Sequence, residues 1–186
     1  MRVGIDFDGV IADIQGFKKE LAYALYGVNI QNEVIDRDKV IEEGYLTSNQ
    51  YRHLQSMIYR NPITSRAIKP INGAIKYINK LHKRGYDIVI ITSRGKTELQ
   101  NVRHWLDSKK LNINLVGTNR NPDKSAACHN ISVYVDDQLR KLEYLQEIVP
   151  HRFWFSSSEN IIPSSSLVRQ VNSWFNLYNE ITKLDP

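Results

Sequence analysis

The chain begins with a short apolar stretch that runs directly into two carboxylates. Residues 3–13 read VGIDFDGVIAD, in which Asp6 and Asp8 stand one residue apart and Gly9 follows. Like charges this close repel each other, and each is costly to remove from water. A buried strand that ends in this way needs a compensating positive charge, and a bound cation is the natural candidate.

Further apolar segments follow at intervals along the chain. The segments at 2–7, 87–92, 113–117, 132–135 and 152–155 are apolar on both faces, as strands buried between helices must be. Helical periodicity fills the intervals between the later segments, so strands and helices alternate. The sequence therefore predicts an α/β fold with a doubly wound, parallel five-stranded sheet.

One interval is far longer than a crossover helix needs. Between the first two predicted strands, apolar residues recur at helical spacing, first at Ile14, Phe17 and Leu21 and again within 47–59. This pattern indicates a small helical insertion directly after the Asp6/Asp8 strand. We expect a core domain formed by residues 1–13 and 71–186, with the insertion spanning 14–70.

The charge of the chain is uneven. Its net charge is +5, and no Asp or Glu occurs between Gly44 and Tyr86, where Arg52, Arg60 and Arg66 fall. These arginines fit equally well as solvated helix faces or as attraction for an anionic substrate. The chain contains no recognisable nucleic-acid-binding module or long basic run, so no nucleic-acid partner is expected.

Three features of the sequence favour the cytoplasm. No apolar run approaches the ~20 residues that a membrane span needs. The opening residues MRVGIDFDGV contain an aspartate where a signal peptide would remain apolar. The single cysteine, Cys128, has no partner for an internal disulfide, which favours a reducing compartment. We expect a cytoplasmic protein with no membrane partner.

A second carboxylate pair, Asp136 and Asp137, ends the fourth predicted strand. In open α/β sheets, ligands bind beyond the carboxyl ends of the strands, where the strand order reverses. If the first and fourth strands are neighbours, Asp6, Asp8 and Asp136 converge on one crevice. Such a set of oxygen ligands suits Mg²⁺.

Two other segments end at the same edge of the predicted sheet. The second strand ends in Thr92, Ser93 and Arg94, where a hydroxyl, free backbone N–H groups and a following helix suit a phosphate. Lys124 lies at the start of a predicted helix that leads to the fourth strand. There its ammonium could neutralise both a phosphate and a carboxylate.

Taken together, these segments resemble the haloacid dehalogenase-like (HAD) superfamily of phosphohydrolases. The stretches DFDGV, IITSR and VDD, with Lys124 before the last, occur in the order of the superfamily's motifs over residues 2–137. The helical insertion is similar to a C1-type cap. The small size of this insertion and the short VDD motif are similar to those of the cytosolic type C 5′(3′)-deoxyribonucleotidases and their bacterial relatives. Asp8 favours phosphate ester hydrolysis, because dehalogenases of the superfamily lack this acid.

The resemblance implies a role for each matching residue. Asp6 would be the nucleophile that forms an aspartyl-phosphate, and Asp8 the general acid. Thr92 would hydrogen-bond a phosphoryl oxygen, and Lys124 would balance charge. The implied Mg²⁺ ligands are Asp6, Asp8 through its backbone carbonyl, and Asp136. Asp137 would either hold a metal-bound water or orient Lys124.

The substrate is the least constrained part of the prediction. The candidate contacts are Phe17, which could face the cleft, Ser93, and Arg94, which is either a second phosphate contact or a solvated charge. Several nucleotidases carry proline or alanine where this chain has Arg94. The resemblance implies a small phosphorylated substrate, first of all a nucleoside monophosphate. The alternatives are another substrate, either a sugar phosphate or a 3′-phosphate, and a phosphate-binding role without catalysis. The chain could also act as a homodimer.

Overall fold

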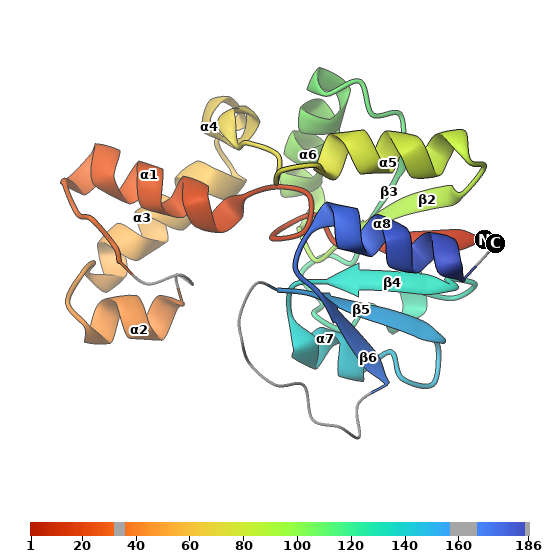
Figure 1. Ribbon diagram of the computed structural model, residues 1–186. Coiled ribbons are helices and arrows are strands. Elements are labelled where there is room, and N and C mark those ends of the chain that lie inside the picture. The colour runs from red at the N-terminus through yellow and green to blue at the C-terminus, as the bar shows by residue number, and fades with distance from the viewer. Residues whose placement is uncertain (32–35, 157–166, 185–186) are drawn as a thin grey trace.

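The computed structural model describes residues 1–31, 36–156 and 167–184. Six strands lie within these ranges: β1 (Arg2–Ile5), β2 (Asp87–Thr92), β3 (Asn114–Gly117), β4 (Val133–Asp136), β5 (His151–Phe155) and β6 (Val168–Val171). They form one sheet in the order β3-β2-β1-β4-β5-β6, and every neighbouring pair is parallel. The chain winds outward from β1 to β3 and then returns to add β4 on the other side of β1 (Figure 1).

The helices begin and end at the residues that their sequences favour. Asp13 caps the first helix, because its Oδ1 accepts a hydrogen bond from the Gly16 N–H at 2.8 Å. Thr47 and Gln50 form a capping box at the start of the third. The helices of the described ranges are α1 (Ile14–Tyr26), α2 (Arg37–Glu42), α3 (Ser48–Tyr59), α4 (Pro62–Ala67), α5 (Ala74–Lys83), α6 (Lys96–Ser108), α7 (Leu139–Glu143), α8 (Trp174–Lys183) and the 3₁₀ turn η1 (Ser125–Ala127).

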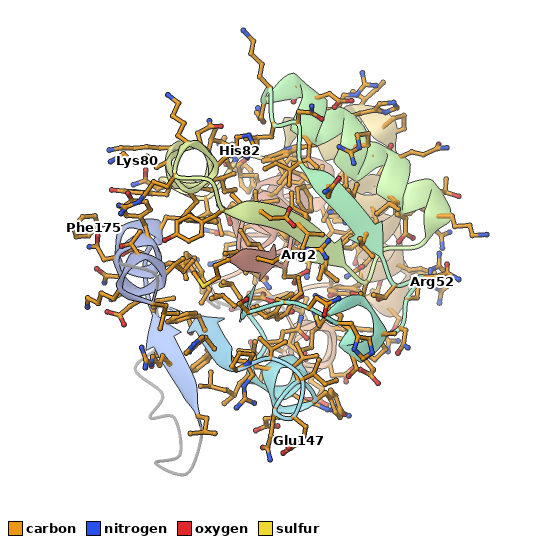
Figure 2. The ribbon with its side chains drawn as sticks, turned by 90° about the vertical axis from the view of Figure 1, so that its right-hand side faces the viewer. Arg2, Arg52, Lys80, His82, Glu147 and Phe175 are labelled. Atoms are coloured by element: carbon orange, nitrogen blue, oxygen red, sulfur yellow. The ribbon has the colours of Figure 1, made fainter. Side chains whose placement is uncertain are left out.

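The sheet buries both of its faces. Ile88 and Ile90 of β2 belong to the apolar layer that includes α5, α6 and α8, whereas Val89 and Ile91 pack in a second layer with Leu142 of α7. Figure 2 shows the outer sides of both layers. Lys80 and His82 of α5 and Phe175 of α8 project from one of them, and Glu147, which follows α7, projects from the other. Burial on both faces explains why these strands read as continuous apolar runs.

The predicted α/β class and doubly wound parallel sheet are confirmed, but the predicted number of five strands is wrong. The additional strand is β6, which pairs only with β5 and therefore forms an edge of the sheet. Its central residues, Arg169 and Gln170, are exposed. An edge strand with polar central residues lacks the continuous apolar run by which the other strands were predicted.

Helices α1 to α4 lie together beyond the carboxyl ends of the strands, on one side of the sheet (Figure 1). Hydrogen bonds connect this group to α6, among them two that involve buried side chains of α6. The Asn101 side chain donates to the Tyr59 carbonyl at 3.0 Å, and the Trp105 indole N–H donates to the Ile68 carbonyl at 2.8 Å. The division into a core (1–13 and 71–186) and a cap (14–70) stays a prediction. Among the described helices, none combines the length and the apolar character needed to cross a membrane.

Candidate active site

The carboxylates of the first and fourth strands meet at the edge of the sheet where the strand order reverses. Asp6 directly follows β1, Asp136 is the last residue of β4, and these two strands pair in parallel. The Asp6 N–H donates to the Val135 carbonyl at 2.9 Å, so the backbone hydrogen bonds between β1 and β4 continue as far as Asp6. Both carboxylates are buried, with Asp6 2% exposed and Asp136 0%. This edge is where doubly wound sheets bind ligands.

Lys124 lies between the two buried carboxylates. Its Nζ is 2.8 Å from Asp6 Oδ1, 2.8 Å from Asp136 Oδ2 and 2.7 Å from the Tyr134 hydroxyl. The three donors of the ammonium thus each have an acceptor. Tyr134 fits here because β1 has a glycine opposite, since a Cβ on Gly4 would lie 2.7 Å from the Tyr134 ring. The Lys124 ammonium therefore makes burial of both carboxylates tolerable.

Negative charge still exceeds positive charge in this cluster. Burial, together with the Asp136 carboxylate, raises the pKa of Asp6 to about 6, although Lys124 and Lys141 act in the opposite sense. Burial and the charges of Asp6 and Asp136 also raise the pKa of Asp137. Burial alone would lower the pKa of Lys124, but the two carboxylates raise it above its ordinary value. Three carboxylates, those of Asp6, Asp136 and Asp137, thus share two ammonium groups, so a further cation would be favourable here.

The donor set fits a hard divalent cation. Carboxylate oxygens of Asp6, Asp136 and Asp137 all lie within 4.8 Å of one another. Asp137 Oδ1 is buried and has no hydrogen-bond partner among the residues described. Gly9 makes room for the other oxygen, because a Cβ there would come 2.1 Å from Asp137 Oδ2, and its φ of +80° is one that glycine adopts freely. An all-oxygen set with an unsatisfied carboxylate oxygen suits Mg²⁺.

Asp8 stands apart from this cluster and pairs with Arg94. Arg94 Nη2 lies 2.6 Å from Asp8 Oδ1, and Arg94 Nε lies 3.1 Å from Asp8 Oδ2. Thr92 is buried at the end of β2, and its hydroxyl accepts from the Arg94 N–H at 3.4 Å. Ser93 follows in a half-buried position. The structure thus places Arg94 against the predicted general acid, and the predicted roles of Thr92 and Ser93 stay predictions.

A cavity of about 1060 Å³ opens beside the carboxylates. Gly9, Asp137 and Gln138 line it from the sheet edge, Lys18 and Tyr51 from helices α1 and α3, and Phe155 from the end of β5. Phe17 does not line this cavity; it is half-buried and packs against the apolar core. The aromatic side chains that line this cavity are those of Tyr51 and Phe155.

The three arginines of the acid-free stretch lie away from this cavity. Arg52 and Arg60 line a separate cavity of about 560 Å³, and Arg60 Nε is 3.6 Å from a Glu98 oxygen. Arg66 Nη2 lies 3.5 Å from His104 Nδ1. None of the three is among the residues that surround the carboxylate cluster in the described parts of the chain.

Two site lysines were not predicted from the sequence. Lys141, on α7, has its Nζ 3.7 Å from Asp6 Oδ2 and 3.6 Å from Asp136 Oδ1. Lys18, on α1, is 6% exposed, and burial lowers its pKa although the charges of Asp8 and Asp137 oppose this. The position of Lys141 in the first helix after the fourth strand was an available signal. Lys18 had no such signal, because its direction depends on how α1 packs.

Comparison with known proteins relates the whole chain to one family. The family described as "5' nucleotidase, deoxy (Pyrimidine), cytosolic type C protein" matches residues 1–184. A protein from Chlorobaculum tepidum that bears the name "Putative 5'(3')-deoxyribonucleotidase" is 29% identical over 113 residues. The match covers 57% of this chain and 56% of that relative, so the chain spans about half the length of the curated relative it matches.

Solved structures share the fold at low sequence identity. A HAD family hydrolase from Deinococcus radiodurans, solved with bound phosphate and sodium, has a TM-score of 0.65 and 14% identity, with 98% of this chain and 95% of that chain covered. A HAD-hydrolase from Bacillus subtilis, bound to magnesium, has a TM-score of 0.64 and 15% identity, with 97% and 98% covered. At these identities the likeness concerns the fold.

Proposed function

Because this chain belongs to the family of cytosolic type C 5′-nucleotidases, we propose that it is a magnesium-dependent phosphatase acting on nucleoside monophosphates through an aspartyl-phosphate. The observation that carries this proposal is the buried cluster in which Lys124 joins Asp6 to Asp136 at 2.8 Å on each side. The cluster lies beside Asp137, which lines the large cavity. A cytoplasmic location belongs to the same proposal and agrees with the word "cytosolic" in the family's description.

Asp6, Asp136 and Asp137, with the backbone carbonyl of Asp8, would hold the magnesium ion. When bound, the ion would draw a phosphate into the carboxylate cluster and offset the repulsion between an anionic nucleophile and an anionic substrate. Lys124 would contribute to the same balance from the other side of Asp6. Thr92 would donate its hydroxyl hydrogen to a phosphoryl oxygen.

The reaction would proceed in two steps. In the first, a carboxylate oxygen of Asp6 forms a bond to phosphorus while the bond to the leaving oxygen breaks, and Asp8 gives its proton to that oxygen. In the second, a water attacks the phosphorus and loses a proton to Asp8, and the bond to Asp6 breaks. Asp6 is then a free carboxylate and Asp8 is again protonated, so the cycle closes with release of phosphate and an alcohol.

The cavity supports a leaving group larger than a simple alcohol. Its volume of about 1060 Å³ and the rings of Tyr51 and Phe155 would accept a nucleoside, since aromatic side chains stack on bases. Phe17, which was expected to face the cleft, does not line this cavity, so we propose Tyr51 and Phe155 as the contacts of the base.

A substrate screen tests the proposed function. Phosphate release is measured with p-nitrophenyl phosphate, dUMP, dTMP, a 3′-nucleotide and a sugar phosphate, each with Mg²⁺. We expect turnover of p-nitrophenyl phosphate and the highest kcat/KM with a nucleoside monophosphate. A preference for the sugar phosphate would replace the substrate assignment, and absence of all turnover would favour a phosphate-binding protein that does not catalyse.

Removal of the metal gives a second prediction. We expect EDTA to lower turnover by at least about 100-fold and added Mg²⁺ to restore it, because the carboxylate cluster would repel the substrate without the ion. Mg²⁺ should also raise the unfolding temperature of the wild type by mass action. An Asp137→Asn variant should show a smaller rise, and full activity in EDTA would contradict the proposed metal site.

A further inference from the structure

We propose that Arg94 is a positioning residue that orients the Asp8 carboxylate toward the leaving oxygen, and that the aromatic rings of Phe7 and Tyr59 hold Arg94 in place. This inference rests on the proposed phosphatase function. It differs from the expectation that Arg94 contacts the substrate. The support comes from the contacts of the guanidinium group, its burial and its two aromatic neighbours.

The guanidinium group binds both oxygens of Asp8. The distances of 2.6 Å from Nη2 to Oδ1 and 3.1 Å from Nε to Oδ2 describe two parallel hydrogen bonds between planar groups. Such a fork fixes the plane of the carboxylate as well as its distance. A lysine could supply the charge but could not fix that plane. The geometry therefore points to control of direction, which is what proton transfer to one particular oxygen requires.

Two aromatic rings hold the guanidinium group in this orientation. Its Cζ lies 5.1 Å from the centre of the Phe7 ring and 4.8 Å from the centre of the Tyr59 ring. Phe7 is itself fixed, because its ring packs edge-on against Trp105 at 5.1 Å. Guanidinium groups are attracted to aromatic faces, most strongly where water is excluded. The rings therefore favour one orientation of Arg94 and, through it, of Asp8.

Tyr59 connects this arrangement to the helical insertion. It is the last residue of α3, and its carbonyl accepts the hydrogen bond from Asn101 of α6. Phe7 and Arg94, by contrast, belong to the loops that follow β1 and β2. The orientation of Asp8 thus depends on a residue from the helical insertion as well as on residues from the sheet edge.

Burial argues against direct substrate contact by Arg94. Its side chain is 4% exposed, whereas that of Asp8 is 26% exposed. Asp8 is therefore more accessible to a substrate than Arg94, and the guanidinium group spends two of its hydrogen bonds on Asp8, so an effect of Arg94 on catalysis would pass through Asp8.

Two esters with different leaving groups test this inference. p-Nitrophenolate leaves without much need for a proton, whereas the alcohol of dUMP must be protonated as it leaves. We expect Arg94→Met to lower kcat/KM for dUMP by about 100-fold while kcat/KM for p-nitrophenyl phosphate changes less than about fivefold, because kcat/KM reports the transfer to Asp6 and not the later hydrolysis that both esters share. The inhibition constant of inorganic phosphate should change less than about threefold, because Arg94 does not touch the phosphate.

Four further variants make the result specific. Asp8→Asn should reproduce the leaving-group dependence, and Arg94→Lys should retain much of the defect because it lacks the fork. Arg169→Met, which removes an exposed arginine of β6, should match the wild type. Tyr59→Leu removes one ring without creating a buried unpaired charge, so it should show a weaker form of the same pattern even if Arg94→Met folds poorly.

The outcomes separate this inference from the proposed function. Equal losses of kcat/KM with both esters and an inhibition constant for phosphate raised about tenfold or more would make Arg94 a direct substrate contact and overturn the positioning role. Wild-type values of kcat/KM for both esters in Arg94→Lys and in Tyr59→Leu would also overturn the positioning role of Arg94. If the wild type hydrolyses neither ester with Mg²⁺, the proposed function fails, and the inference fails with it.

Discussion

Asp6→Asn is expected to lose phosphatase turnover on the order of 10⁴-fold or more, because the amide cannot attack phosphorus and no other group can replace the nucleophile. Asp6 Oδ1 is held 2.8 Å from Lys124, and the Asp6 backbone continues the sheet ladder. The substitution changes neither the size of the side chain nor the backbone. Phosphate release under saturating substrate and Mg²⁺ measures the effect.

The matched control for this variant is Asp107→Asn, which makes the same chemical change on the exposed surface of α6 and should keep wild-type turnover. Asp6→Asn should unfold at a temperature close to that of the wild type, since it removes one of several buried negative charges. Turnover of Asp6→Asn within tenfold of the wild type would exclude Asp6 as the nucleophile.

Lys124→Met is expected to lower the free energy of unfolding by about 3–5 kcal/mol in the absence of metal, as removal of one partner from a buried ion pair does. The substitution leaves Asp6 and Asp136 buried without their shared ammonium, and it leaves the Tyr134 hydroxyl without its donor. Urea unfolding at neutral pH, followed by circular dichroism, measures the difference. Turnover should fall together with stability.

Magnesium provides the internal check on this prediction. Because a bound divalent cation would compensate the same carboxylates, saturating Mg²⁺ should narrow the stability difference between Lys124→Met and the wild type. Lys83→Met, which removes an exposed lysine at the end of α5, should unfold like the wild type. A Lys124→Met variant as stable as the Lys83→Met control in EDTA would show that Lys124 does not compensate the buried carboxylates.

The parallel sheet and the position of the carboxylates at one edge of it follow from simple features of the sequence. The strand before Asp6 and the strand before Asp137 are apolar on both faces, which places them inside the sheet and their polar ends at one edge. The meeting of the carboxylates was predicted on the condition that the first and fourth strands are neighbours, and the structure fulfils that condition. The edge strand β6 escapes this reasoning, because Arg169 and Gln170 interrupt its apolar pattern.

The remaining site contacts depend on tertiary packing. Lys141 reaches the carboxylates from α7, and Lys18 of α1 lines the same cavity as Asp137. The inward faces of these helices are set by how they pack, and periodicity alone does not identify a buried lysine. The pairing of Arg94 with Asp8 depends on two loops that follow different strands. The half-buried position of Phe17 against the core, away from the large cavity, has the same origin, since the direction of its ring depends on how α1 packs.

Mapping the phosphorylated residue tests most directly whether Asp6 is the nucleophile of this site. The wild type is mixed with labelled substrate and Mg²⁺, quenched in acid within the first turnover, and reduced with borohydride, which converts a phosphorylated aspartate to homoserine. We predict homoserine at position 6 by mass spectrometry and none in Asp6→Asn treated identically. Homoserine at any other position, or continued turnover with no more homoserine at position 6 than in that variant, would contradict the account.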